Sequence, residues 1–280
     1  MKTTIKLIIS VLVSFISVSA FNKNLTTLSK PASLQPNPET VKDPVTITIL
    51  YDNYVHEKGT QADWGFSCLI ENTSKTILFD TGTDPAILNK NVKILNKELS
   101  QIDAIVISHN HGDHTGGLFD VLKRLDKVEV YLPHSTPGPN MNKVEKAGAV
   151  LFYEKDSIQI CENCYLTGEL GDNIKEQSLI IDTEKGLALV TGCSHPGIVN
   201  IVKRAKELLG KEVYMVLGGF HLMRYSTEMT NEIIAKLRTL GVKKCGPTHC
   251  SGDETIQIFR EAFGNNFIQL GTGQVIKIFP

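Results

Sequence analysis

The sequence predicts an α/β fold in which sheets pack together and helices cover them on the outside. Each half of the chain begins with strand-like segments and continues with alternating strands and helices, a pattern typical of a layered sandwich. No Gly-x-Gly-x-x-Gly turn follows the first predicted strand, which argues against a doubly wound dinucleotide-binding sheet. No segment recurs at a fixed period, so a solenoid is not indicated.

The first half of the domain predicts five strands and two helices. The strands are short apolar runs or alternate Thr with β-branched residues, and they cover residues 45–50, 66–70, 76–79, 104–107 and 128–132. The second and third of these strands form a hairpin about the polar turn at 71–75. Helical spacing predicts a helix over 85–99, capped by Thr83 or Asp84 ahead of Pro85, and another over 117–125.

The second half follows a Pro/Gly-rich loop at 133–140 and starts with a less regular region that ends in 158–166. A second hairpin is expected from 178–181 and 186–191. Regular alternation then predicts helices at 198–209, 227–240 and 254–263, and strands at 213–217, 242–245, 267–270 and 275–278.

The N-terminus resembles a targeting segment rather than part of the fold. Lys2 and Lys6 precede an apolar stretch that ends in small residues at Ala20, so residues 1–20 are predicted to be a secretory signal peptide. The stretch is short for a membrane span, although an uncleaved anchor is the alternative. Residues 21–43 are polar and Pro-containing, as in a flexible linker, and the folded domain is expected over 44–280. We therefore expect an exported protein, periplasmic or secreted, with no stable membrane span after cleavage.

Charge and composition narrow the range of partners. The 280 residues carry a formal net charge of −1, which argues against an electrostatic nucleic-acid binder. The hydrophobic content of 41% is ordinary for a globular chain with a sizeable core. A small molecule is the expected partner.

The most informative segment is residues 109–114, which reads His-Asn-His-Gly-Asp-His after an apolar β-forming run. Imidazole and carboxylate groups are ligands for zinc-like divalent ions. In an extended backbone His109, His111 and Asp113 would point to one side, and a turn would be needed to aim His114 at a second ion. The segment therefore predicts a site for one or two metal ions.

Three further histidines follow predicted strands in glycine-containing loops: His195, His221 and His249. The carboxyl ends of neighbouring strands meet at one edge of a layered sheet, so we expect these side chains beside the first cluster. His56 and His134 lack this setting and are expected to be structural.

The cysteines allow several interpretations. Cys161 and Cys164 could form a redox pair or a tight disulfide, but no second Cys-x-x-Cys is present to complete a zinc knuckle. Cys68 lies in an apolar run and is expected to pack as a small hydrophobe.

The pattern of residues 109–114, with Asp80 upstream and His249 near the end, resembles the metallo-β-lactamase superfamily. The resemblance implies an αββα sandwich with a one- or two-metal site along one edge. It implies that His109 and His111 bind the first metal, and that Asp113, His114 and His249 bind the second.

Three further roles follow from the same resemblance. Asp80 is expected to hydrogen-bond the site rather than bind metal. No histidine lies at 173–178, so His195 is the best third ligand of the first metal. Cys193 lies near the position of the usual bridging aspartate, where it could bridge as a thiolate or merely pack. Zinc is the expected metal, with manganese or iron as alternatives.

Residues 191–197 (Thr-Gly-Cys-Ser-His-Pro-Gly) and 218–221 (Gly-Gly-Phe-His) resemble a narrower branch of the superfamily. Its members are labelled as related to a dihydropterin-linked ribofuranosylaminobenzene 5′-phosphate synthase. That label implies a phosphorylated pterin-like or nucleotide-like ligand.

The expected function is a metal-dependent hydrolase. Water bound to zinc-like ions has its pKa lowered to roughly 7, so hydroxide is available at neutral pH. Asp113 and His114 would position it. His221 would protonate a leaving group or bind an anionic oxygen, unless it is the missing metal ligand. A small anionic phosphoester or phosphodiester is the first expectation for the substrate. A carbonyl ester such as a lactone, thioester or β-lactam is the alternative, and a non-catalytic metal- or ligand-binding protein is another.

Overall fold

The computed structural model describes residues 44–279, so the predicted signal peptide and linker lie outside the described residues. Within this part of the chain, no helix is both long and apolar enough to cross a membrane.

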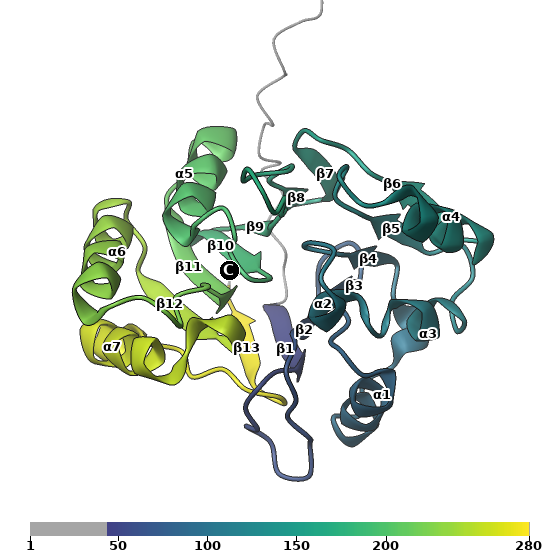
Figure 1. Ribbon diagram of the computed structural model, residues 1–280, viewed down its shortest axis with the longest axis horizontal. Helices are drawn as coiled ribbons and strands as arrows, with labels where there is room; N and C mark the ends of the chain where they lie inside the picture. The colour runs from purple at the N-terminus through teal and green to yellow at the C-terminus, as the bar shows by residue number, and fades with distance from the viewer. Residues whose placement is uncertain (1–43, 280) are drawn as a thin grey trace, which may run out of the picture. The chain divides into compact units, whose positions relative to one another are not determined.

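Two sheets form the centre of the domain (Figure 1). The seven-stranded sheet has the order β13 (Val275–Ile278), β1 (Val45–Tyr51), β2 (Ser67–Glu71), β3 (Ile77–Phe79), β4 (Ala104–Val106), β5 (Glu129–Tyr131) and β6 (Val150–Phe152). The six-stranded sheet has the order β12 (Lys244–Thr248), β11 (Val213–Gly219), β10 (Gly186–Thr191), β9 (Leu179–Thr183), β8 (Cys164–Leu166) and β7 (Ile158–Cys161).

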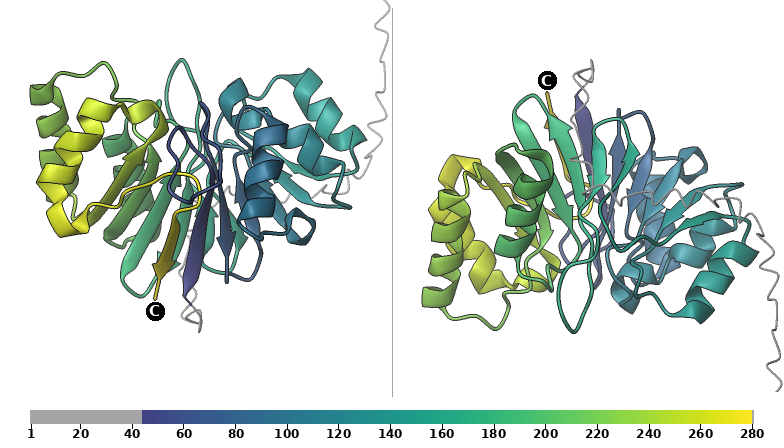
Figure 2. Two further views of the ribbon diagram at one scale, coloured as in Figure 1. Left: turned by 90° about the horizontal axis from the view of Figure 1, so that it is seen from below. Right: turned by 90° about the horizontal axis from the view of Figure 1, so that it is seen from above.

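Helices cover the outer face of each sheet, as the two views of Figure 2 show. The seven-stranded sheet packs against α1 (Pro85–Ile94), α3 (Leu118–Leu122) and α4 (Gly138–Lys146). The six-stranded sheet packs against α5 (Ile198–Leu209), α6 (Thr227–Thr239) and α7 (Asp253–Phe263). The expected αββα sandwich is confirmed.

Alternation along the strands explains the four layers. In β10, Ala188 and Val190 face the core between the sheets, whereas Leu187 and Leu189 face the helices. Because successive side chains in a strand point to opposite faces, a strand covered on both faces is apolar throughout. Three buried cores result, one between the sheets and one beneath each helical layer.

The direction of the strands sets the position of the site. β3, β4 and β5 run parallel, as do β10, β11 and β12. The carboxyl ends of these strands therefore lie at one edge of the sandwich, and the loops that follow them carry the histidines.

Some predicted boundaries were wrong. The helix expected over 85–99 ends at Ile94, because Asn96 adopts a left-handed conformation with φ 52° and turns the chain. Asp84 caps that helix as expected, its side chain accepting a hydrogen bond of 2.7 Å from the backbone N–H of Ala86. The strand expected over 267–270 is reduced to a single bridge between Phe267 and Cys245.

Three other segments differ from expectation. The helix predicted over 117–125 is shortened to α3 (118–122), and a separate short helix, α2 (Gly112–Thr115), precedes it. Helix α4 begins inside the predicted 133–140 loop with a proline in its first turn. The region ending in 158–166 contains a regular hairpin, β7–β8, whose strands of four and three residues are too short to show a clear period.

Candidate metal centre

Side chains from both sheets meet at the carboxyl ends of the parallel strands. The seven-stranded sheet contributes the loop after β4 and the short helix α2. The six-stranded sheet contributes the loops after β10, β11 and β12. The donors that gather there are His109, His111, Asp113, His114, Cys193, His195, His221 and His249.

One donor group contains His109, Cys193 and His195, whose ligand atoms lie within 4.8 Å of one another. His111 adjoins it, because its Nδ1 lies 3.0 Å from His109 Nε2 and its ring centre lies 5.0 Å from that of His195. This group supplies three imidazoles and a thiol.

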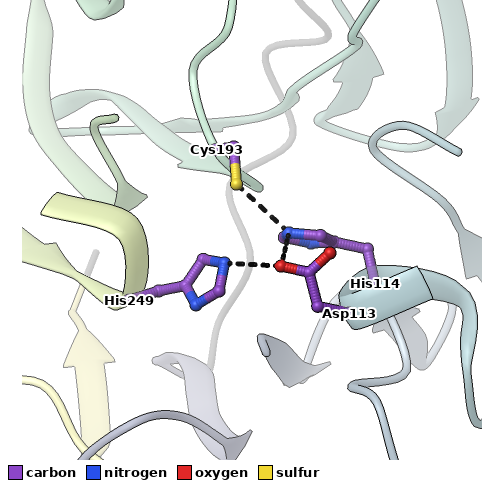
Figure 3. A group of neighbouring side chains, drawn as sticks. All are labelled: Asp113, His114, Cys193 and His249. Atoms are coloured by element: carbon purple, nitrogen blue, oxygen red, sulfur yellow. Dashed lines mark hydrogen bonds and ion pairs between the residues drawn. The ribbon is translucent and has the colours of Figure 1, made fainter. Parts of the chain in front are cut away.

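The second donor group contains Asp113, His114, Cys193 and His249, again with ligand atoms within 4.8 Å (Figure 3). His249 Nε2 lies 3.3 Å from Asp113 Oδ2, and His114 Nε2 lies 3.3 Å from Cys193 Sγ. Cys193 belongs to both groups, so its sulfur lies between them.

The expectation that His109, His111 and Asp113 share one side of an extended segment was wrong beyond His111. Helix α2 begins at Gly112, with His111 as the residue before it. Asp113 and His114 therefore reach the site from a helical turn, and Asp113 joins His114 rather than the first two histidines.

Two side chains orient these imidazoles. Asp80 is buried and accepts hydrogen bonds of 2.7 Å from Ser108 N, Ser108 Oγ and His114 Nδ1. Because a carboxylate only accepts, His114 carries its proton on Nδ1 and presents the Nε2 lone pair to the site. Asn53 Oδ1 lies 3.0 Å from His249 Nδ1 and orients that ring in the same way.

Glu176 organises the loop after β10, a role that the sequence did not reveal. Its Oε1 accepts from the backbone N–H groups of Gly192, Cys193 and Ser194, and its Oε2 accepts from His195 N. These partners lie 16 to 19 residues further along the chain. No local pattern at 173–178 predicts such contacts.

Trp64 is a second residue that the sequence did not indicate. Its Nε1 donates a hydrogen bond of 2.9 Å to Asp113 Oδ2, and its ring centre lies 4.9 Å from that of His249. It comes from the loop between β1 and β2, which carries no recognisable motif.

The donor atoms fit a metal. His195 Nε2 is buried and has no hydrogen-bond partner among the described residues, and the buried His249 Nε2 has Asp113 Oδ2 as a neighbour, 3.3 Å away. Burial without a partner is costly unless a ligand uses the lone pair. Imidazole nitrogen, carboxylate oxygen and thiol sulfur are the donors that zinc and similar ions take. These residues would hold one or two such ions between the sheets.

Comparison with known proteins identifies the family. Residues 65–202 match the model of the metallo-β-lactamase superfamily. The 7,8-dihydropterin-6-methyl-4-(β-D-ribofuranosyl)-aminobenzene-5′-phosphate synthase of Methanocaldococcus jannaschii is 34% identical over 289 residues, which cover 84% of this chain and 97% of the relative. The chain belongs to the metallo-β-lactamase superfamily. The resemblance inferred from the motifs is confirmed.

Solved structures agree with this assignment. Tm1679, described as a metal-dependent hydrolase of the β-lactamase superfamily, superposes with a TM-score of 0.70 at 26% identity, covering 84% of this chain and 100% of that one. The short form of human tRNase Z and a diphosphatase of the PhnP family share the fold. Their TM-scores are 0.58 and 0.54, their identities 16% and 14%, and they cover 83% and 85% of this chain and 99% of their own chains.

In this superfamily member, backbone strain is concentrated at the metal centre. Asp80, Ser194, His221 and His249 adopt left-handed conformations, with φ of 55°, 62°, 53° and 51°. Non-glycine residues in this region cost roughly 1–3 kcal/mol each and persist where the surroundings enforce them. All four follow strands that end at the site, so the fold holds these side chains in place against a local preference.

Electrostatics lower the pKa of two imidazoles at the centre and raise that of a third. Burial, together with the neighbouring His221 and His111, lowers the pKa of His195 to about 4. Burial and adjacent histidines also lower the pKa of His109. For His114, burial lowers the pKa but the Asp80 carboxylate outweighs it, so the pKa is raised. Neutral imidazole is the form that binds metal.

Other predicted residues lie away from the centre. His56 and His134 are exposed, and His134 Nδ1 lies 3.1 Å from the carbonyl oxygen of Tyr153. Cys161 and Cys164 lie opposite each other in the β7–β8 hairpin as free cysteines, at the sheet edge opposite β12. Cys68 is buried in the core between the sheets.

Proposed function

We propose that this protein is a metal-dependent hydrolase of a small anionic phosphoester or phosphodiester. The observation that carries the proposal is the pair of adjoining donor groups that share Cys193, with the buried and unpartnered Nε2 atom of His195 in the first of them. Zinc is the proposed ion, at one or two per chain, with manganese or iron as alternatives.

The bound ions would polarise the phosphoryl oxygen and lower the pKa of water. Asp113 would accept a hydrogen bond from that water and orient it. Its carboxylate is suited to this because it stays ionised. Burial raises the pKa of Asp113, but hydrogen bonding with His249 and the charges of His114 and His249 outweigh burial, so the pKa is lowered. Trp64 also fixes this carboxylate, by donating a hydrogen bond to Oδ2.

His221 is placed to act on the substrate. It follows β11, its side chain is exposed, and its ring centre lies 4.4 Å from that of His195. A solvent-facing imidazole beside the donor groups would bind an anionic oxygen or protonate a leaving group.

A cavity of about 370 Å³ adjoins the centre and supports a substrate that carries a ring. It is lined by His249 and by the aromatic side chains of Trp64, Tyr54 and Tyr225. Trp64 and Tyr225 are 46% and 41% exposed, so their faces are free to pack against a planar group. The name of the 34% identical relative describes a phosphorylated aminobenzene compound, which is consistent with such a substrate.

That relative also favours a second candidate, a synthase that acts on a related phosphorylated compound. The carbonyl-ester alternative has weaker support. The hydroxyacylglutathione hydrolase of Buchnera aphidicola is 31% identical, but over only 41% of this chain and 40% of its own.

A substrate panel with and without chelator tests the proposal. It would include bis-p-nitrophenyl phosphate, p-nitrophenyl phosphate, an acyl-homoserine lactone, a glutathione thioester and nitrocefin, assayed with wild type, His111→Ala and the control His134→Ala. Phosphoester turnover that chelator and His111→Ala both abolish, with His134→Ala unaffected, is the expected result. Turnover confined to the carbonyl esters would replace the phosphoester assignment. Bound metal with no turnover of any compound would instead favour a binding protein.

We further propose that the protein acts outside the cytoplasm. The basic start and the apolar stretch up to Ala20 support export, as does the polar segment before the folded domain. Fractionation of cells that express the full chain, with N-terminal sequencing of the product, tests this. Full-length protein in the cytoplasmic fraction would contradict it.

A further inference from the structure

A third donor group lies beside the metal centre, and one of its members, Cys250, has no role in the proposed reaction. It contains Cys193, His221 and Cys250, whose ligand atoms lie within 4.8 Å of one another. We propose that these three residues form an additional cation position, selective for soft or borderline ions such as Cd²⁺, Cu⁺ or Zn²⁺. The proposal rests on the proposed function only in sharing Cys193 and His221 with it.

The three residues come from adjacent parallel strands of one sheet. Cys193 follows β10, His221 follows β11, and Cys250 lies in the 3-10 turn His249–Ser251 after β12. Cys250 Sγ lies 3.6 Å from the carbonyl oxygen of Cys193, so the two loops are in contact. The fold thus brings two sulfurs and an imidazole together at the ends of three neighbouring strands.

The surroundings are shaped around the Cys250 sulfur. A Cβ atom at Gly219 would lie 2.4 Å from the backbone oxygen of Gly192, 2.7 Å from Cys250 Sγ and 3.2 Å from Cys193 Cα, so a larger residue there would collide with the loop after β10 as well as with the sulfur. His221 adopts its left-handed conformation two residues later and turns its ring toward the same point. Glycine at 219 and strain at 221 both favour this placement.

Access from solvent distinguishes this donor group from cysteines that are simply packed in the core. Both sulfurs are buried, but His221 is exposed, so an ion could enter from solvent past the imidazole. Cys245, on strand β12 just before this turn, is also buried. It packs in the core under the helices and belongs to none of the donor groups found in the described part of the chain. Burial alone therefore does not account for Cys250.

The donor chemistry points to the class of ion. Two thiolates and one imidazole form a softer set than the imidazole-rich and carboxylate-containing groups beside it, and soft ligands select Zn²⁺, Cu⁺ and similar ions. A thiolate can bridge two cations, but the sulfur of Cys193 belongs to three donor groups. An ion at the additional position would therefore compete with the other two positions for this sulfur.

Cobalt substitution of the purified protein tests the proposal, because thiolate-to-cobalt charge-transfer absorption in the near ultraviolet reports sulfur ligands directly. Wild type would be compared with Cys250→Ser, His221→Ala, His111→Ala and the control Cys245→Ser. We expect Cys250→Ser to reduce the near-ultraviolet band to roughly half, since one of two thiolates is lost, with Cys245→Ser unchanged. His221→Ala, at an exposed position, should lower the cobalt content without unfolding the protein. Circular dichroism of each variant checks the fold.

The outcomes distinguish this inference from the proposed hydrolase. A band of full intensity in Cys250→Ser overturns the additional position, even if His111→Ala still loses cobalt. A band that depends on Cys250 but a cobalt content that is indifferent to His111→Ala would support the position and contradict the proposed centre. Addition of Cd²⁺ should displace the sulfur-bound cobalt first and so remove the near-ultraviolet band. Retention of that band would contradict a preference of this position for soft ions.

Discussion

Trp64 Nε1 donates a 2.9 Å hydrogen bond to Asp113 Oδ2, the same oxygen that lies 3.3 Å from His249 Nε2. Trp64 is the only tryptophan in the chain. Its indole therefore contacts two candidate ligands of one donor group, and its fluorescence arises from that location alone.

Addition of zinc to the metal-free protein should change the intensity or wavelength of tryptophan emission. The cause is the change in charge on Asp113 and His249 when they bind the ion. A fluorescence titration measures it, with metal content determined in parallel. Trp64→Phe should lose the signal while retaining zinc, and His56→Ala should behave as wild type. Zinc uptake without any change in emission would place the ion away from Trp64.

Asp80→Asn should weaken zinc binding by roughly 10- to 100-fold, because the charged partner of His114 Nδ1 is lost. Asparagine tolerates the left-handed conformation at this position, where φ is 55°, so the backbone is preserved. Competition with a chromophoric chelator measures the affinity. Asp182→Asn, which removes a buried carboxylate paired with Lys211 elsewhere, is the control and should bind zinc normally. Equal affinities of wild type and Asp80→Asn would contradict this role.

Glu176→Ala should destabilise the metal-free protein by about 3 kcal/mol or more, since each buried donor left unsatisfied costs about 1–3 kcal/mol. The donors involved are Thr191 Oγ1 and the N–H groups of Gly192, Cys193, Ser194 and His195. Urea unfolding measures the loss. Glu176→Gln retains one acceptor oxygen and should lose less stability. Equal losses for the two variants would show that shape, not hydrogen bonding, is what matters.

Cys161 should be the reactive thiol among the cysteines away from the centre. Hydrogen bonding from the Cys164 thiol, against the effect of burial, lowers the pKa of Cys161 to about 7, with Ser74 and Lys75 contributing. Because the thiolate is the nucleophile, its alkylation rate should rise as pH increases through 7 and level off above it. Cys164→Ala should move the midpoint to higher pH.

Mass spectrometry of the iodoacetamide products, taken over a pH series, locates the modified residue. Cys68 is fully buried, and burial raises its pKa, so it should remain unmodified in the folded protein. Labelling of Cys68 at the rate of Cys161 would indicate that the fold is open. If no thiol reacts until a reductant is added, the pair is a disulfide.

Much of the fold follows from short-range patterns in the sequence. Helix α5 and strand β13 have the predicted bounds, because their apolar spacing is regular, Gly210 ends the helix and a turn at Gly273 precedes the strand. The β7–β8 hairpin was missed, because pairing in strands of three or four residues depends on neighbours such as β9 rather than on local pattern.

In the site, too, residues in a local pattern could be predicted and residues that act through distant contacts could not. Residues 109–114 could be predicted as metal ligands from the sequence because four donors lie within six positions. Glu176, Trp64 and Asn53 act through contacts made across the fold, such as the one between Asn53 and His249, which are 196 residues apart. A single carboxylate, indole or amide in a loop carries no pattern, so only the structure reveals these residues.

Because one sheet supplies Asp113 and His114 and the other supplies Cys193 and His249, a bound ion would cross-link the two halves of the sandwich. Such an ion binds the folded chain and not the unfolded one, so it adds to stability in proportion to the logarithm of its free concentration, about 2.7 kcal/mol at a hundredfold excess over Kd. The lifetime of the protein would then follow the metal supply of its surroundings. Scarcity of the ion would lower the amount of the protein by unfolding and proteolysis as well as emptying its metal centre.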